Sequence, residues 1–266
     1  MAVETIHLIH HTHADYGYTD LPQTCRRQLA RYLQEAIAIA DRTREYPEAA
    51  RMRFTCEITW QFEDFLDRAS DEEIASWNRL VDAGDFELGA FPFHTSALLE
   101  MNECQALLDG ASAVYERYQP KSCFQNDING LPWGLIPSLV ARGVRYVMMG
   151  INPYSGAVPI KAPAGFWWQG PDGSRLLAWV GLQYCAGFSF FHPKEWRVGP
   201  VPPQDDVWFN PPQGREIFDE RPPALAKAHQ HLLSQLEEQL DQYPHRVLGL
   251  QITNMWRLDN DPPCEQ

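Results

Sequence analysis

The stretch Ile6-His7-Leu8-Ile9-His10-His11-Thr12-His13-Ala14-Asp15-Tyr16-Gly17 decides how this chain is interpreted. A short apolar run that ends in polar residues and a glycine is typical of a buried strand entering a loop. Because side chains alternate along extended backbone, we expect His11, His13 and Asp15 to point to the same side. Imidazole and carboxylate groups that converge can hold a divalent metal ion, although a histidine is also often only a hydrogen-bond partner.

The composition is that of a globular domain with a large core. The 266 residues are 44% hydrophobic and 21% charged, which suits one α/β domain. The net charge of -13 argues against nucleic acid or an anionic membrane surface as a partner. No apolar stretch approaches the length of a membrane span. The aromatic content of 12% favours a carbohydrate ligand, but core packing explains these rings equally well.

The cysteines indicate a reducing compartment. There are 6 of them, widely spaced, and none forms a C-x-x-C pair. This spacing fits neither a zinc knuckle nor a disulfide scaffold. The chain starts without a basic segment or a long apolar segment, so we expect no signal peptide and a cytoplasmic location.

Strand and helix patterns alternate over the first 150 residues. We expect strands over 5–10, 51–58, 86–91, 122–125 and 144–149, and helices over 22–44, 60–69, 103–118 and 131–142. Thr59 is the expected N-cap of the second helix. The capping box Ser70-Asp71-Glu72-Glu73 begins a further helix that ends at Gly84. This order predicts a parallel sheet that is closed, or nearly closed, into a barrel.

The pattern changes after residue 150. Residues 166–169 and 175–180 flank a turn sequence and predict a hairpin. A long loop rich in proline follows over 182–223. We then expect a helix over 222–243 and a last strand over 246–253.

Polar residues follow each predicted strand, where barrel enzymes assemble their active sites. Asp127 is the best second carboxylate beside the histidines, although an N-cap or Asx turn is its alternative role. Glu57 and His94 are weaker candidates, since each could be bonded only to backbone. The strand-end residues are His11, His13 and Asp15 after the first strand, Glu57 after the second, His94 and Thr95 after the third, Asp127 after the fourth, and Asn254, Arg257, Asp259 and Asp261 after the last.

Four of these segments together resemble the N-terminal catalytic domain of glycoside hydrolase family 38, the α-mannosidases. The family's His-Ser-His-Asn-Asp-x-Gly-Trp motif stands here as His11-Thr12-His13-Ala14-Asp15-Tyr16-Gly17-Tyr18. Glu57-Ile58-Thr59-Trp60 is similar to its Glu-x-x-Phe-Phe segment, and Gly89-Ala90-Phe91 to its Gly-Gly-Trp segment. Its Asp-Pro-Phe-Gly-His-Ser motif is represented by Asp127-Ile128-Asn129-Gly130-Leu131-Pro132.

The resemblance implies a distorted (β/α)7-type barrel of the glycoside hydrolase/deacetylase kind. It implies a zinc ion held by His13, Asp15 and Asp127, and retaining hydrolysis of α-mannosides with Asp127 as nucleophile. It also leads us to expect Glu57, His94 and Trp60 among the substrate-binding residues.

The chain departs from the family pattern in three places. The general acid of the family has no carboxylate in register here, and Asp259 is the nearest substitute. The family's fourth metal ligand, a distant histidine, falls beyond this chain. The acidic pair that follows the Gly-Gly-Trp segment is replaced by Thr95 and Ser96.

These departures leave three functions open. The first is a zinc-dependent α-mannosidase, the second a metal-dependent carbohydrate deacetylase, and the third a non-catalytic carbohydrate-binding remnant. We expect residues 1–266 to form one family 38-like domain. An apolar face should be exposed where the family's downstream domains, or a partner chain, would dock.

Overall fold

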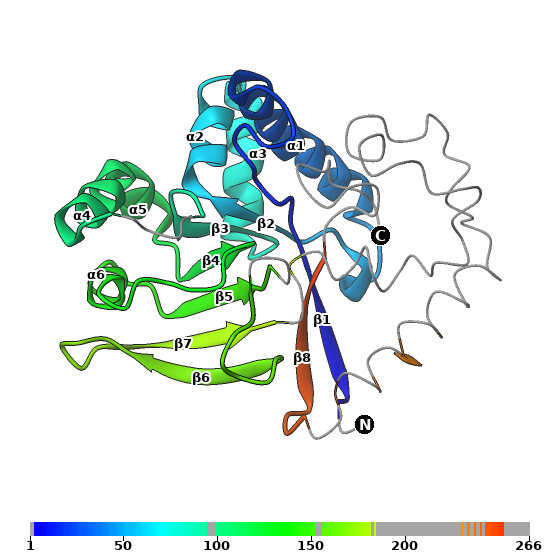
Figure 1. The fold of residues 1–266 in the computed structure, drawn as a ribbon. Helices are drawn as coiled ribbons and strands as arrows, with labels where there is room; N and C mark the ends of the chain where they lie inside the picture. The colour runs from blue at the N-terminus through cyan, green and yellow to red at the C-terminus, as the bar shows by residue number, and fades with distance from the viewer. Residues whose placement is uncertain are drawn as a thin grey trace.

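Strand β1 (Thr5–His10) pairs in parallel with β8 (Val247–Ile252), so the first and last described strands lie side by side (Figure 1). The computed structural model describes residues 3–94, 99–152, 156–181 and 243–252, together with Tyr184 and five positions between 230 and 240. Two further ladders complete the strands. They are β2 (Phe54–Ile58) with β3 (Phe86–Phe91), and β4 (Ser122–Asn126) with β5 (Tyr146–Gly150), β7 (Arg175–Val180) and β6 (Ala164–Gln169).

The expected parallel arrangement is present in all strand pairs except β6 with β7, and the architecture is mixed α/β. β6 is antiparallel to β7 and closes the predicted hairpin at the edge of its ladder. Backbone pairing between the ladders is sparse in the described residues, with one isolated bridge from His11 to Thr55 joining β1 to β2. The strands of the described residues therefore form three separately hydrogen-bonded ladders.

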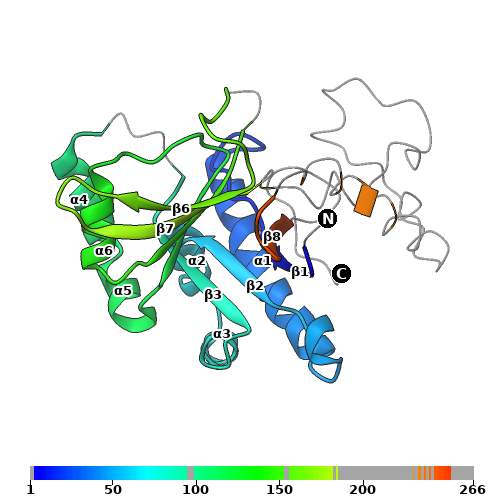
Figure 2. The ribbon, with the colours of Figure 1, turned by 90° about the horizontal axis from the view of Figure 1, so that it is seen from below.

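Helices pack beside the ladders in two groups (Figure 2). The first group packs with β2 and β3 through a core that contains Phe62, Phe65 and Trp77, all fully buried. The second packs with β4, β5 and β7 around Leu135, Ile136 and Leu139. The first comprises α1 (Pro22–Thr43), α2 (Thr59–Leu66) and α3 (Asp71–Asp82), and the second α4 (Met101–Gly110), α5 (Ser112–Tyr118) and α6 (Leu135–Ala141).

The best-predicted helix boundaries have strong local signals. Proline stands at the start of α1, and the predicted capping box at Ser70 and Glu73 is present at the start of α3. Gly84 follows α3 with φ of +79°, a conformation that favours glycine.

Four of the boundaries that differ from the sequence prediction have a local reason. β2 begins at Phe54 because the amide of Met52 donates to the hydroxyl of Thr43 on α1 instead of joining a ladder. Thr59 is the first helical residue of α2, so Ile58 takes the N-cap position and no side chain caps this helix. The helix expected over 103–118 is divided at Ala111, next to Gly110. The helix expected over 131–142 starts only at Leu135, because residues 132–135 form a turn.

Other predictions lie partly outside the described residues, including the loop 182–223 and most of the helix 222–243. Cys25, Cys56, Cys104 and Cys123 are buried and free. Burial raises the pKa of the Cys123 thiol to about 12. No described helix combines the length and apolar character that a membrane span requires.

His10, at the end of β1, gives a test of the fold by pH. Burial, and then the neighbouring His11, lower its pKa from 6.5 to about 3, and its Nε2 has no hydrogen-bond partner in the described structure. Below pH 6.5 the unfolded chain therefore binds a proton that the folded chain excludes. As the pH is lowered from 6.5 to about 3, this group should decrease the free energy of unfolding by up to ~1.4 kcal/mol per pH unit.

The His10→Phe variant should lose stability less steeply than the wild type over this range. Urea denaturation at several pH values measures both slopes. Equal slopes would show that His10 is protonated in the folded protein.

Candidate active site

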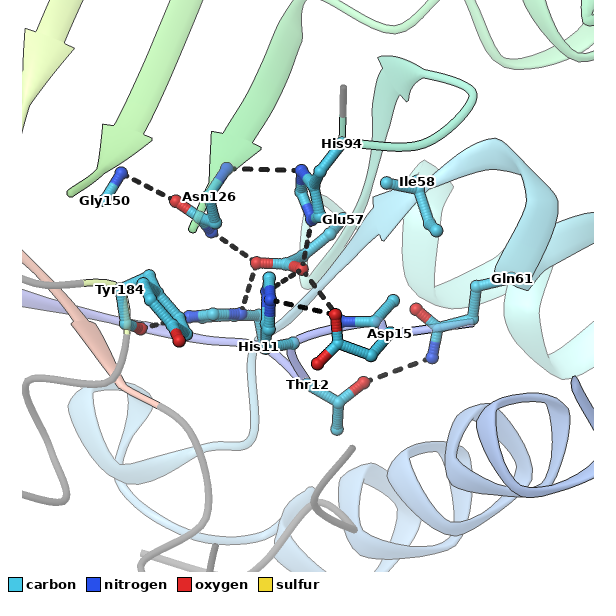
Figure 3. A network of polar contacts seen from close by, with 12 residues as sticks. His11, Thr12, Asp15, Glu57, Ile58, Gln61, His94, Asn126, Gly150 and Tyr184 are labelled. Carbon is cyan, nitrogen blue, oxygen red and sulfur yellow. Dashed lines mark hydrogen bonds and ion pairs between the residues drawn. The ribbon is translucent and has the colours of Figure 1, made fainter. Parts of the chain in front are cut away.

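The residues that follow β1 are buried and face the neighbouring strands. His11, Thr12 and His13 are at most 1% exposed. The amide of His11 donates to the carbonyl of Ile252 at 3.0 Å, so extended pairing continues beyond β1. His11 and His13 both contact Glu57, as the alternation of side chains leads one to expect. Figure 3 shows His11 beside Glu57.

Glu57, near the end of β2, is the centre of this polar network. Its side chain is fully buried. Oε1 lies 2.7 Å from His11 Nδ1 and accepts from the amide of Asn126. Oε2 lies 3.2 Å from His13 Nδ1, 2.8 Å from His94 Nε2 and 3.3 Å from the Ala14 amide nitrogen.

The charge of Glu57 is stabilised by these neighbours. Burial by itself would raise the pKa of the carboxyl, but His11, His94 and His13 together hold it well below its usual range. The buried group is therefore an ionised carboxylate surrounded by donors.

A bulge in β3 makes room for Glu57. Cys56 pairs with Leu88 and Ile58 with Phe91, so β3 contains one more residue than β2 over this span. A β-carbon placed on Gly89 would lie 2.2 Å from the backbone oxygen of Glu57. Glycine is therefore required at this close approach of the two strands.

Asn126 joins the ladders at the end of β4. Its amide nitrogen donates to Glu57, and its oxygen accepts from the Gly150 amide at 2.8 Å and from Gln251 Nε2 at 3.0 Å. These bonds link β4 to β2, β5 and β8. One side chain thus holds the same end of all three ladders.

Asp127 turns the chain out of β4. Its φ is 60°, in the left-handed region, and its amide donates to the carbonyl of Gly150 at 3.0 Å. Aspartate tolerates this conformation better than most residues. The turn lets Asn126 and Asp127 serve the same site, which regular alternation in a strand would not allow.

Two groups of side chains have the composition and spacing of a metal site. His13, Asp15 and Asp127 form one group, and His13, Glu57 and His94 form the other, each with its ligand atoms within 4.8 Å of one another. In the first group, His13 Nε2 lies 3.8 Å from Asp15 Oδ1. Burial raises the pKa of Asp15, His13 opposes this shift, and the negative charge of Asp127 raises it further. Two carboxylates in this position would be stabilised by a cation.

The other expected site residues are placed as follows. His94 lies beside Glu57, and its ring stacks on that of His13 with centroids 5.1 Å apart. Trp60, at the start of α2, is 42% exposed and contacts Phe93 and Tyr16 with centroids 4.6 and 5.8 Å apart. Thr95, Asn254, Arg257, Asp259 and Asp261 lie outside the described residues.

Three residues of this polar network were not assigned a role from the sequence. Asn126 and Gln251 are polar residues at the ends of predicted strands, and this position could have identified them. The carbonyl of Tyr184 lies 2.8 Å from His11 Nε2, but a backbone group leaves no signal in the sequence.

The fold and the site define a mixed α/β protein with a histidine–carboxylate cluster at the carboxyl ends of parallel strands. The family model for the glycosyl hydrolases family 38 N-terminal domain matches residues 4–245. The chain therefore belongs to this family, and the resemblance seen in the sequence motifs is confirmed.

Solved structures agree with this assignment at the level of the fold. An alpha-mannosidase from Enterococcus faecalis V583 is similar with a TM-score of 0.64 and 15% identity, over 98% of this chain and 26% of that chain. A protein in the glycosyl hydrolase family 38 from Enterococcus faecalis is similar with a TM-score of 0.57 and 12% identity, over 96% of this chain and 24% of that chain. This chain thus spans about a quarter of the length of these two proteins. No curated protein matches the sequence.

The contact between Gly89 and Glu57 can be tested by adding one methyl group. The Gly89→Ala variant should be destabilised by about 1–3 kcal/mol, because the β-carbon can be accommodated only by moving β3 away from β2. Urea denaturation measures the loss. The control is Gly110→Ala, where a β-carbon meets nothing within 4 Å. Equal stability of the two variants would contradict the close approach.

Proposed function

We propose that this chain forms the catalytic site of a zinc-dependent retaining glycoside hydrolase that acts on α-mannosides. The observation that supports this most strongly is the meeting of His13, Asp15 and Asp127, with ligand atoms within 4.8 Å, in a chain of family 38. We further propose that the three ladders belong to a distorted (β/α)7-type barrel, since their site residues lie at one end of parallel strands.

The donor set fits zinc. One imidazole nitrogen and two carboxylates are ligands that Zn²⁺ accepts in catalytic sites, where a further position stays open for substrate. Burial raises the pKa of Asp15, His13 lowers it, and the nearby charge of Asp127 raises it further when no cation is close. When bound, the metal would supply Lewis acidity and orient the hydroxyls of the sugar.

Asp127 is the proposed nucleophile. Its carboxylate attacks the anomeric carbon, the bond to the leaving oxygen breaks, and a glycosyl ester forms on Asp127. Water then attacks the same carbon and releases the sugar. The turn at Asp127, with its backbone amide bonded to Gly150, holds the carboxylate in place.

Retaining hydrolysis also requires a second carboxyl about 5 Å from the nucleophile, which protonates the leaving oxygen. Asp259 is proposed for this role from the sequence. It follows β8 in the sequence, as the corresponding segment of the family follows a late strand.

Loss of the metal ligands gives a direct test. We expect about one zinc per wild-type chain by elemental analysis, and much less in His13→Ala and Asp127→Asn. Turnover of an aryl α-mannoside should fall at least about 1,000-fold in Asp127→Asn, because the amide cannot act as nucleophile. Asparagine tolerates the left-handed conformation, so this variant keeps the local backbone.

The control is Asp82→Asn, which removes an exposed carboxylate on α3. Zinc without turnover of α-mannosides, but with release of acetate from acetylated sugars, would favour a deacetylase. Sugar binding with neither zinc nor turnover would favour a carbohydrate-binding domain.

Trp60 is proposed as a stacking surface for the substrate. Its ring is partly exposed and is supported by Phe93 and Tyr16. The Trp60→Ala variant should raise KM for the α-mannoside about 2- to 10-fold, from roughly 0.5–1.5 kcal/mol for one ring contact. The value of kcat should change little, since the contact is the same in the ground state and the transition state.

Trp167→Ala is the matched control, because Trp167 is an exposed tryptophan on β6. A fall in kcat with unchanged KM for Trp60→Ala would place this ring in another role.

A further inference from the structure

The carboxylate of Glu57 is surrounded by hydrogen-bond donors. Five nitrogen atoms face its two oxygens, and they come from the loop after β1, the residues after β3 and the end of β4. An ionised carboxylate can only accept hydrogen bonds. Each ring nitrogen that bonds to it must therefore carry its proton.

For His13 this condition fixes a proton on Nδ1. Its Nδ1 lies 3.2 Å from Glu57 Oε2 and so donates to it. A neutral imidazole carries one proton, which leaves Nε2 with a lone pair. This is the nitrogen that lies 3.8 Å from Asp15 and belongs to the group with Asp127.

His94 is fixed in the opposite tautomer. The backbone amide of Asn126 donates to its Nδ1 at 3.2 Å, so Nδ1 must be the acceptor. Its Nε2 therefore carries the proton and donates to Glu57 at 2.8 Å. The lone pair of His94 is already used by an amide, so this ring has none to offer a metal ion.

His11 faces an acceptor on each side. Its Nε2 lies 2.8 Å from the carbonyl oxygen of Tyr184, and its Nδ1 lies 2.7 Å from Glu57 Oε1. Glu57 is therefore the partner of one ring nitrogen on each of the three histidines.

We propose that Glu57 is a positioning residue that sets the tautomers of this histidine cluster, so that His13 presents an unprotonated Nε2 toward Asp15 and Asp127 while His94 stays outside the metal site. His13, Glu57 and His94 are then a hydrogen-bonded cluster that orients His13, and His13, Asp15 and Asp127 are the group that would hold the metal ion. The identity of the metal rests on the proposed function, but the tautomers do not.

Nitrogen NMR of the histidine rings in the metal-free protein tests this directly. We expect His13 to carry its proton on Nδ1 and His94 on Nε2, with resonances assigned through His13→Gln and His94→Gln. Both tautomers must match for the proposal to stand. A proton on His13 Nε2, or on His94 Nδ1 alone, would overturn it.

The second test measures metal affinity by competition with a chelator. Glu57→Gln replaces one accepting oxygen with an amide that points its own hydrogens at the histidines. We expect zinc to bind about 10- to 100-fold more weakly, as is usual when the partner of a ligating histidine is lost. Glu87→Gln is the control, because Glu87 lies on β3, bonded to Ser122 and outside the histidine cluster.

The two tests separate this proposal from the proposed function. Unchanged zinc affinity in a folded Glu57→Gln variant would overturn the positioning role. Should that variant fail to fold, the tautomers of the wild type still decide. Should the wild type bind no zinc, the proposed function fails, and the ring tautomers again settle the role of Glu57.

Discussion

The buried carboxylate of Glu57 holds together the polar network of this site in the described residues. Placing an ionised group in a protein interior costs several kcal/mol, unless nearby charges and hydrogen bonds compensate it. Glu57 is compensated by three histidines, an asparagine amide and a backbone amide, supplied by residues near the ends of β1, β3 and β4. Since these elements belong to three separate ladders, the network also performs a structural task. It joins strands that share little backbone pairing in the described residues.

Two local features of the backbone make the network possible. The bulge at Gly89 brings β3 against the backbone of Glu57, where any larger residue would collide. The left-handed turn at Asp127 directs two successive residues of one strand end to a single site. Both are uncommon conformations, and both occur beside the cluster, where bulges and strained residues often aim functional groups.

Much of this could be predicted from the sequence because the signals are local. The alternation of His11, His13 and Asp15 follows from strand geometry, and the capping box at Ser70 defines α3 without tertiary information. The role of Glu57 could not be predicted in this way, because its partners are separated from it by up to 69 residues in the chain. The same limit applies to Thr59. Its N-cap signal was outweighed because the adjoining strand and helix leave no extra residue between them.

Five of the residues that the sequence offered as possible ligands or substrate contacts are divided into two kinds by their contacts. His13, Asp15 and Asp127 face one another with like charges close together, an arrangement that favours a cation. Glu57 and His94 have their polar atoms bonded to protein groups, an arrangement that favours support over ligation. Trp60 belongs to neither kind, since its ring is partly open to solvent. His13 belongs to both groups, through different nitrogens. The imidazole ring is suited to this position because one nitrogen can donate while the other accepts. The hydrogen bond from Nδ1 to Glu57 thereby orients the ring and sets which nitrogen faces Asp15 and Asp127.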